Sequence, residues 1–286
     1  MKKVSKKMKN MQKLLLIMLG VCLLPDIYGQ SSGEKKSPAS LAIELKNAHI
    51  WRGIDVTHNF LIDANLKLTD KTNMFAIGLW GATTFTQDFR EFDYYVGFYK
   101  GGFTLEIWDI LNFSGKNRYS AANPYGYNTE KAFDYSAHST GHFVDLRLGY
   151  TFPQKFPLHL GWSTVIYGRD RAWIPGADPD DYKDRLYSNS RYSTYVEADY
   201  PVLKSNIVDL KVGIAGVFKF RDAKIDGQII KGNFYGKSNG IVNCNLVASR
   251  NFRFSDAYSL PVILTWMWNP QANKTYMEVA MRVIQF

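Results

Sequence analysis

The sequence predicts an all-β protein, a closed antiparallel transmembrane β-barrel of about 12 strands. Three observations lead to this class. Apolar and polar residues alternate with a period of two along most of the chain, short and long connections alternate between these segments, and Tyr and Trp gather near the segment ends. The period of two is typical of a strand with two unlike faces, because successive side chains point in opposite directions.

The N-terminus predicts export. Six lysines precede an apolar run over residues 14–24, which Pro25 ends and the small residue Gly29 follows. This order is typical of a secretory signal peptide, so we expect a signal peptide over 1–29 cleaved near Gly29, a short leader over 30–40 and a barrel over 41–286. Cys22 offers a weak lipobox alternative, which Val21 disfavours.

Removal of the signal peptide changes what the charge implies. It takes away six lysines and one acid, so the formal charge falls from +9 to +4. The basic character therefore belongs largely to the leader, and nucleic-acid binding is not indicated. Cys244 is the one cysteine left, which excludes an internal disulfide.

Residues 60–68 illustrate the alternation. The even positions are apolar, whereas Asp63, Asn65 and Lys67 occupy the opposite face. A soluble sandwich could share this pattern, so it predicts strands without deciding where they lie. The predicted strands lie near residues 41–50, 60–68, 74–86, 92–98, 103–113, 144–150, 156–167, 191–200, 208–214, 240–250, 259–268 and 275–286.

Connection lengths favour the membrane barrel. Gaps after even-numbered strands are mostly short, and the long ones, near 114–140, 168–190 and 221–238, all follow odd-numbered strands. Segregation of turns and loops at opposite ends is the layout of bacterial outer-membrane barrels. The aromatic residues at strand ends would form the two interfacial girdles, and the terminal Phe286 resembles the signal read by the outer-membrane assembly machinery.

Three short motifs resemble the TorF family of porins, a group of small Gram-negative outer-membrane barrels. They are WRGI at 51–54, which we expect to end the first strand, GLWG at 78–81 and EFDYYVGF at 91–98. Gly81-Ala82 replaces the serine-bearing continuation usual in the family, and the resemblance covers about the first third of the mature chain. It implies an outer-membrane barrel and a suspected pore, and it supplies no catalytic residues.

The polar strand face predicts the lining of a lumen. Both charge signs occur there, so the side chains either pair into a plug or line a water-filled path, and a barrel of this size permits both. The wider set includes Glu44, Lys46, Glu91 and Lys219. The main pore-lining candidates are Asp63, Lys67, Asp93, Glu106, Asp145, Arg147, Glu197, Asp199, Asp209 and Lys211.

From the lumen-lining candidates we expect a passive pore for small hydrophilic solutes. We expect the outer face of the barrel to contact outer-membrane lipid and lipopolysaccharide. A non-conducting barrel with binding or structural loops is the alternative. A lipid-active enzyme is the third hypothesis, for which His142 is the candidate base although no acidic partner is evident in sequence. The acidic stretch 178–184 is interpreted as a solvated loop rather than a Ca²⁺ site, and no metal or cofactor is predicted.

Overall fold

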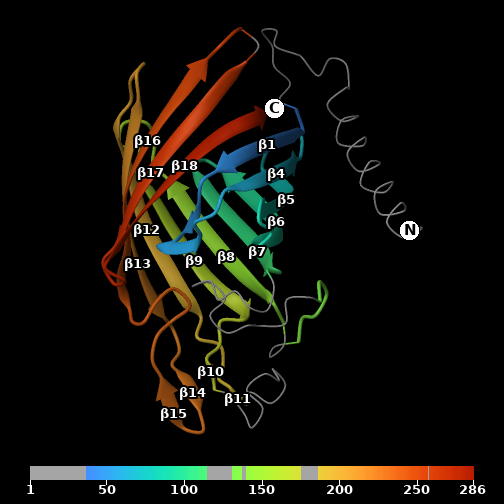
Figure 1. The fold of residues 1–286 in the computed structure, drawn as a ribbon, viewed down its shortest axis with the longest axis vertical. Helices are drawn as coiled ribbons and strands as arrows, with labels where there is room; N and C mark the ends of the chain where they lie inside the picture. Colours follow the sequence, from blue (N-terminus) through green and yellow to red (C-terminus); the bar gives the residue numbers. More distant parts are fainter. Residues whose placement is uncertain (1–36, 115–130, 137–139, 175–185, 257) are drawn as a thin grey trace, which may run out of the picture. The chain divides into compact units, whose positions relative to one another are not determined.

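The computed structural model describes residues 37–114, 131–136, 140–174, 186–256 and 258–286, and within them it is all-β (Figure 1). Twelve antiparallel strands close into one barrel, in the order β1-β18-β17-β16-β13-β12-β9-β8-β7-β6-β5-β4. The predicted fold class is thereby confirmed. The barrel strands are β1 (Ala39–Lys46), β4 (Leu61–Thr69), β5 (Phe75–Thr84), β6 (Arg90–Lys100), β7 (Phe103–Asn112), β8 (His142–Thr151), β9 (His159–Gly168), β12 (Ser193–Leu203), β13 (Asp209–Lys219), β16 (Gly240–Arg253), β17 (Ser259–Asn269) and β18 (Lys274–Gln285).

Closure joins the first and last strands of the barrel. Residues of β1 pair with β18 from Ala42 opposite Gln285 to Lys46 opposite Ala280. The other edge of β1 pairs with β4. No barrel strand therefore has an unpaired edge, which is the condition for a sheet to lie in hydrocarbon, where water cannot satisfy backbone groups.

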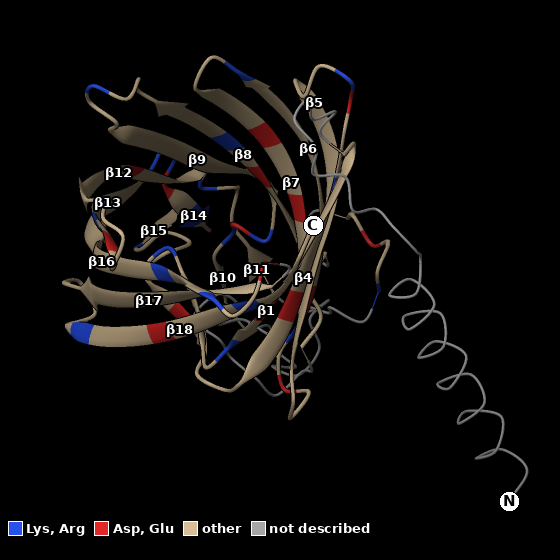
Figure 2. Ribbon diagram, turned by 90° about the horizontal axis from the view of Figure 1, so that it is seen from above, with Lys and Arg blue, Asp and Glu red and all other residues tan. Residues whose placement is uncertain are grey.

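The barrel wall has an apolar outer face. In β4 the even-numbered side chains Ile62, Leu66 and Leu68 are exposed, whereas Asp63 is buried on the inner side. The same alternation recurs in β6, where Phe92 is exposed. Figure 2, a view from above, shows acidic and basic positions within strands such as β7, β8 and β18. An apolar surface that encircles charged strands is suited to lipid rather than to water.

The two ends of the barrel differ. We call the end with connections 70–74, 101–102, 152–158, 204–208 and 254–258 the turn end, and the opposite end the loop end. The three predicted long connections are confirmed, at 113–141, 169–192 and 220–239, and all lie at the loop end. Two of them contain small hairpins, β10 (Trp173–Ile174) with β11 (Leu186–Tyr187) and β14 (Ala223–Ile225) with β15 (Gln228–Ile230).

One expectation about the first strand is wrong. Strand β1 ends at Lys46, and the 51–54 motif instead forms the turn of a separate hairpin, β2 (His49–Trp51) with β3 (Ile54–Thr57). The reason lies in the two central turn residues, because Arg52 and Gly53 have φ of 48° and 85°. Positive φ at both positions is the geometry of a tight hairpin turn, which cannot continue a strand.

Candidate lumen and its plug

The strand register places the ten pore-lining candidates on one face of the wall. Asp93 lies opposite Trp80, Glu106 opposite Arg147, and Asp199 opposite Gly213, all on the side away from the exposed apolar residues. Asp63, Asp93 and Asp145 are buried there, whereas Asp209 and Lys211, near the turn end, are exposed. The candidates therefore share the inner face but not the same depth or environment.

One charged group on that face joins β1, β4 and β18. The Lys46 ammonium lies 2.8 Å from Asp63 and 3.1 Å from Glu44. Arg282 also contacts Glu44, at 2.7 Å. Because each carboxylate has a cationic partner, burial leaves neither Asp63 nor Glu44 as an uncompensated charge.

A second group lies on β6, β7 and β8. Arg147 packs over the Trp108 ring, 4.1 Å from its centroid, and its Nε donates to Asp145 at 2.7 Å. Trp108 stacks on Tyr95 with ring centroids 4.0 Å apart, and its indole N–H donates to Glu106 at 2.6 Å. The rings and charges thus hold one another in a single orientation along this wall.

The β2–β3 hairpin, which we call the plug, lies across the lumen at the loop end. The Arg52 guanidinium at its tip contacts Asp145 of β8 at 2.7 Å and donates to the Tyr235 hydroxyl at 2.8 Å. Burial acts to lower the pKa of Arg52, but Asp145 and Tyr235 outweigh that effect and raise it. Arg52 therefore stays cationic, and Asp145, with no exposed side-chain surface, is its counter-ion.

Three further contacts seat the plug on other strands. The backbone N–H of Ile50 donates to Glu278 of β18 at 2.9 Å, and Asn269 of β17 donates to the carbonyl of Gly53 at 2.8 Å. Gly53 also lies so close to β16 that an added Cβ would overlap the carbonyl oxygen of Val242. The plug is therefore tied to strands on several sides of the lumen, not to one wall.

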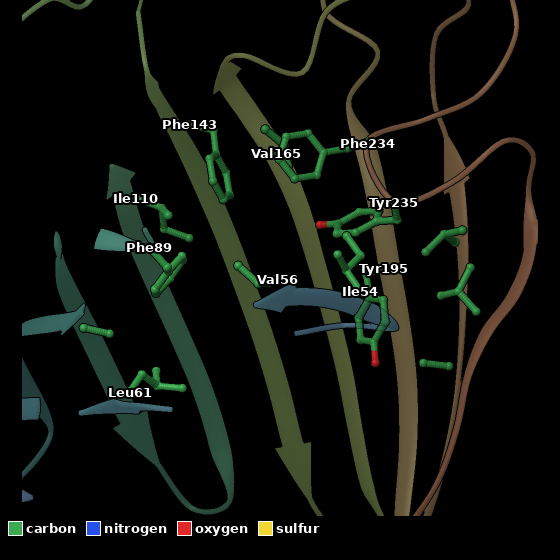
Figure 3. Packing of buried hydrophobic residues seen from close by; sticks show 14 residues of the cluster. Ile54, Val56, Leu61, Phe89, Ile110, Phe143, Val165, Tyr195, Phe234 and Tyr235 are labelled. Atoms are coloured by element: carbon green, nitrogen blue, oxygen red, sulfur yellow. The ribbon is translucent and has the colours of Figure 1, made fainter. Parts of the chain in front are cut away.

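Apolar packing surrounds these polar contacts. Trp51 packs against Phe143, Phe234 and Tyr235, with ring centroids between 5.7 and 6.2 Å away. Figure 3 shows this region, in which Ile54 of the plug and side chains of the wall and of connection 220–239 form one buried cluster. The plug, the wall and connection 220–239 therefore share one buried apolar cluster at the loop end.

His49 of the plug is buried next to aromatic rings. Its ring lies 5.6 Å from the rings of both Trp80 and Phe89. Burial, with a smaller contribution from Lys46, lowers the pKa of His49 to about 3. The His49 imidazole is therefore neutral at physiological pH and adds no positive charge to the plug.

The turn-end half is built differently, with glycines on the inner face. The Tyr95 ring occupies the space that a Cβ on Gly78 would need, and the Asp199 carboxylate does the same at Gly213. These side chains lie along the wall instead of projecting across the lumen. Lys211, 3.6 Å from Asp199, retains 45% of its side-chain exposure. This half of the inner face remains polar and partly exposed.

Sequence reasoning missed Arg52 and Tyr235 as lumen residues. Both lie in connections rather than in alternating strands, so a search of strand faces could not find them. The available signal was Gly53, a turn-favouring residue between two short β-prone segments.

The candidate base His142 lies on the outer face, not in the lumen. Its Nδ1 is 2.7 Å from Asp109, so the structure supplies the acidic partner that the sequence did not reveal. Its Nε2 faces the carbonyl oxygen of Ala132 at 3.0 Å. Among the described residues no hydroxyl occupies the position of a nucleophile on Nε2. The acidic stretch 178–184 and the signal-peptide prediction fall outside the described residues.

Comparison with known proteins finds only weak structural likenesses. No family model and no curated protein matches the chain, so the TorF resemblance stays a prediction. An outer membrane channel from Pseudomonas putida F1 is 14% identical with a TM-score of 0.41, covering 90% of this chain and 100% of that one. A FadL homologue from Pseudomonas aeruginosa is 11% identical with a TM-score of 0.36, covering 82% and 72%. Both TM-scores lie below 0.5, so neither likeness supports a conclusion about this chain.

The fold and the lumen together define a class of protein: a membrane-spanning β-barrel with a polar inner wall and a hairpin folded into the lumen at its loop end.

Proposed function

We propose that this protein is an outer-membrane channel for small hydrophilic solutes, and that the plug holds it closed in the present conformation. The observation that carries the proposal is the plug itself, a hairpin anchored across a charge-lined lumen by the contact between Arg52 and Asp145. A barrel that served only as a scaffold would not need a polar inner wall continuing below a packed core. Passage would then require the plug to leave its seat, driven by a solute, a partner or the membrane potential.

The location follows from the same reasoning. A closed strand barrel with an apolar outer face needs a bilayer, and the predicted signal peptide directs the chain out of the cytoplasm. The outer membrane of a Gram-negative cell is where such barrels are assembled, so we include the outer-membrane assembly machinery among the expected partners.

Single-channel recording of the refolded mature protein in a planar bilayer tests the proposal. We expect the intact protein to be silent, and a variant in which residues 48–58 are replaced by a short Gly-Ser linker to give stepwise currents. Both proteins are first shown to be folded by their heat-dependent shift on gels. Silence from a folded plug-less barrel would contradict the channel proposal.

The lumen candidates give a second measurement. In the plug-less variant, replacing Glu197 and Asp199 with lysine is expected to move the cation-to-anion permeability ratio toward anions. The expected shift is at least about twofold, since unit charges 4 Å apart interact by about 1 kcal/mol even in water. Lys224→Glu, on the β14–β15 hairpin, is the matched control that should leave the ratio unchanged. An unchanged ratio in the lumen variant would remove these residues from the conduction path.

A non-conducting barrel is the second candidate. The buried cluster formed by the plug and connection 220–239 favours it, because a core of this kind is stable without any transport role. In that case the plug-less variant would be silent, and the loop-end connections would be the functional surface.

A further inference from the structure

A polar cluster lies on the outer face of β6 to β9, near side chains that are apolar and exposed, among them Phe92, Val96, Ile107 and Leu148. Asp109 of β7 lies opposite Tyr94 of β6, between the outward-facing residues Ile107 and Leu111. A carboxylate that faces hydrocarbon is costly unless it is paired. The position of Asp109 on the outer face therefore has to be explained by its own contacts and not by a role in the lumen.

The contacts of Asp109 supply the first part of that explanation. One carboxylate oxygen is 2.7 Å from Nδ1 of His142, and the other accepts hydrogen bonds from the hydroxyls of Tyr94 at 2.6 Å and Tyr135 at 2.7 Å. The second ring nitrogen of His142 faces the Ala132 carbonyl. The carbonyl and an ionised carboxylate are both acceptors, so each ring nitrogen of His142 faces an acceptor.

Two of these partners come from a segment outside the barrel strands. Residues 131–136, which we call the strap, belong to the long connection between β7 and β8. The Tyr135 ring stacks on His142 with centroids 4.4 Å apart, and the Tyr135 carbonyl accepts a hydrogen bond from Tyr167 of β9. The strap thus contacts side chains from four neighbouring strands on the outside of the wall, not over the lumen.

The strap also carries Phe133, whose side chain is 89% exposed, the highest value among the exposed large hydrophobic residues of the described chain. Its neighbour Lys131 is exposed as well. A highly exposed aromatic ring two residues from an exposed lysine, on a segment that contacts a lipid-facing wall, has the composition of an interfacial anchor.

We propose that the strap is a lipid-binding element that inserts Phe133 among the acyl chains of the outer leaflet, with the Asp109–His142 pair as its anchor on the wall. The occupant is lipid because the strap lies over the apolar belt that the bilayer must cover. The anchor encloses the one carboxylate of this wall region and removes it from hydrocarbon. This inference does not depend on whether the lumen conducts.

A fluorophore at position 133 tests the proposal. In a Cys244→Ser background, Phe133→Cys is labelled with the environment-sensitive dye NBD and the mature barrel is refolded into vesicles of phosphatidylethanolamine and phosphatidylglycerol. Ile229→Cys, on the exposed β14–β15 hairpin, is the matched control at the same end of the barrel. We expect aqueous dithionite to reduce the dye at 133 at least about tenfold more slowly than at 229, and spin-labelled lipids to quench it only at 133.

The anchor is tested separately. His142→Leu removes both ring contacts and should make the dye at 133 as accessible to dithionite as the dye at 229. Tyr135→Phe, which removes one hydroxyl and keeps the ring, is the milder variant should the first fail to fold, and it should raise the accessibility partway. Equal accessibility at 133 and 229 in the unaltered anchor would overturn the lipid assignment. If the dye at position 133 stays protected from dithionite in both variants, the Asp109–His142 pair is not the anchor of the strap.

Discussion

Replacing Asp145 with alanine is expected to destabilise the barrel by about 3–5 kcal/mol, because it leaves the buried Arg52 guanidinium without a counter-ion. The Tyr235 hydroxyl and the ring of Trp51, 4.7 Å from the guanidinium carbon, remain in contact, but neither neutralises the charge. The least costly response is for the plug to leave its seat and hydrate Arg52. We therefore expect currents from this variant where the intact protein is silent.

The control is a second ion pair on the inner face, in which the aspartate pairs with a partly exposed lysine. Asp199 lies 3.6 Å from Lys211, which is 45% exposed, so Asp199→Ala should cost less than about 1 kcal/mol. Urea titration of the two variants in the same detergent gives the comparison, read as a shift in midpoint at constant slope. If both variants lost the same small amount, Arg52 would not be the anchor of the plug.

Gly53→Ala is expected to have the second largest effect, because both the backbone conformation and the neighbouring strand disfavour a side chain at this position. The residue has a φ of 85°, and its Cβ would overlap the Val242 carbonyl of β16. The left-handed conformation costs about 1–2 kcal/mol for a residue other than glycine. Overpacking adds about 1–3 kcal/mol, unless the hairpin moves away from the wall.

Gly227→Ala separates these two causes. Gly227 has a similar φ of 78°, at the turn of the β14–β15 hairpin, but nothing lies within 4 Å of an added Cβ. It should show the conformational cost alone and leave the conductance of the intact protein unchanged. Gly53→Ala should show the larger loss and open the channel. Equal effects of the two substitutions on stability and current would mean that the plug does not rely on close contact with β16.

The strands and the long connections could be predicted from sequence, whereas the plug could not. The strands were predictable because a period of two is local, as in residues 60–68, and because strand ends are marked by turn residues such as Lys100-Gly101-Gly102. Long connections were predictable because the alternation stops there. The prediction failed at residues 47–60, where two strands of three and four residues are too short to show a period.

The same limit applies to the sites. Arg52 and Asp145 are separated by 93 residues, and no pattern along the chain links an arginine in a turn to an aspartate in a strand. Asp109 was equally hidden, because it continues the outward face of β7 where an apolar residue was expected. The signal that could have indicated the strap is a single polar residue that breaks the alternation, as Asp109 does. Its partners, a histidine and two tyrosines, would have to be considered with it.

The pairing of β1 with β18 has a consequence for how the protein is made. The strand near the start of the described chain has no partner on one side until the strand over Lys274–Gln285 has been synthesised. Contacts so distant in sequence form slowly, since a long loop must be closed before they stabilise anything. The wall therefore cannot close while only its earlier strands exist, and until β18 is present one edge of β1 keeps unpaired backbone groups that another strand could bind.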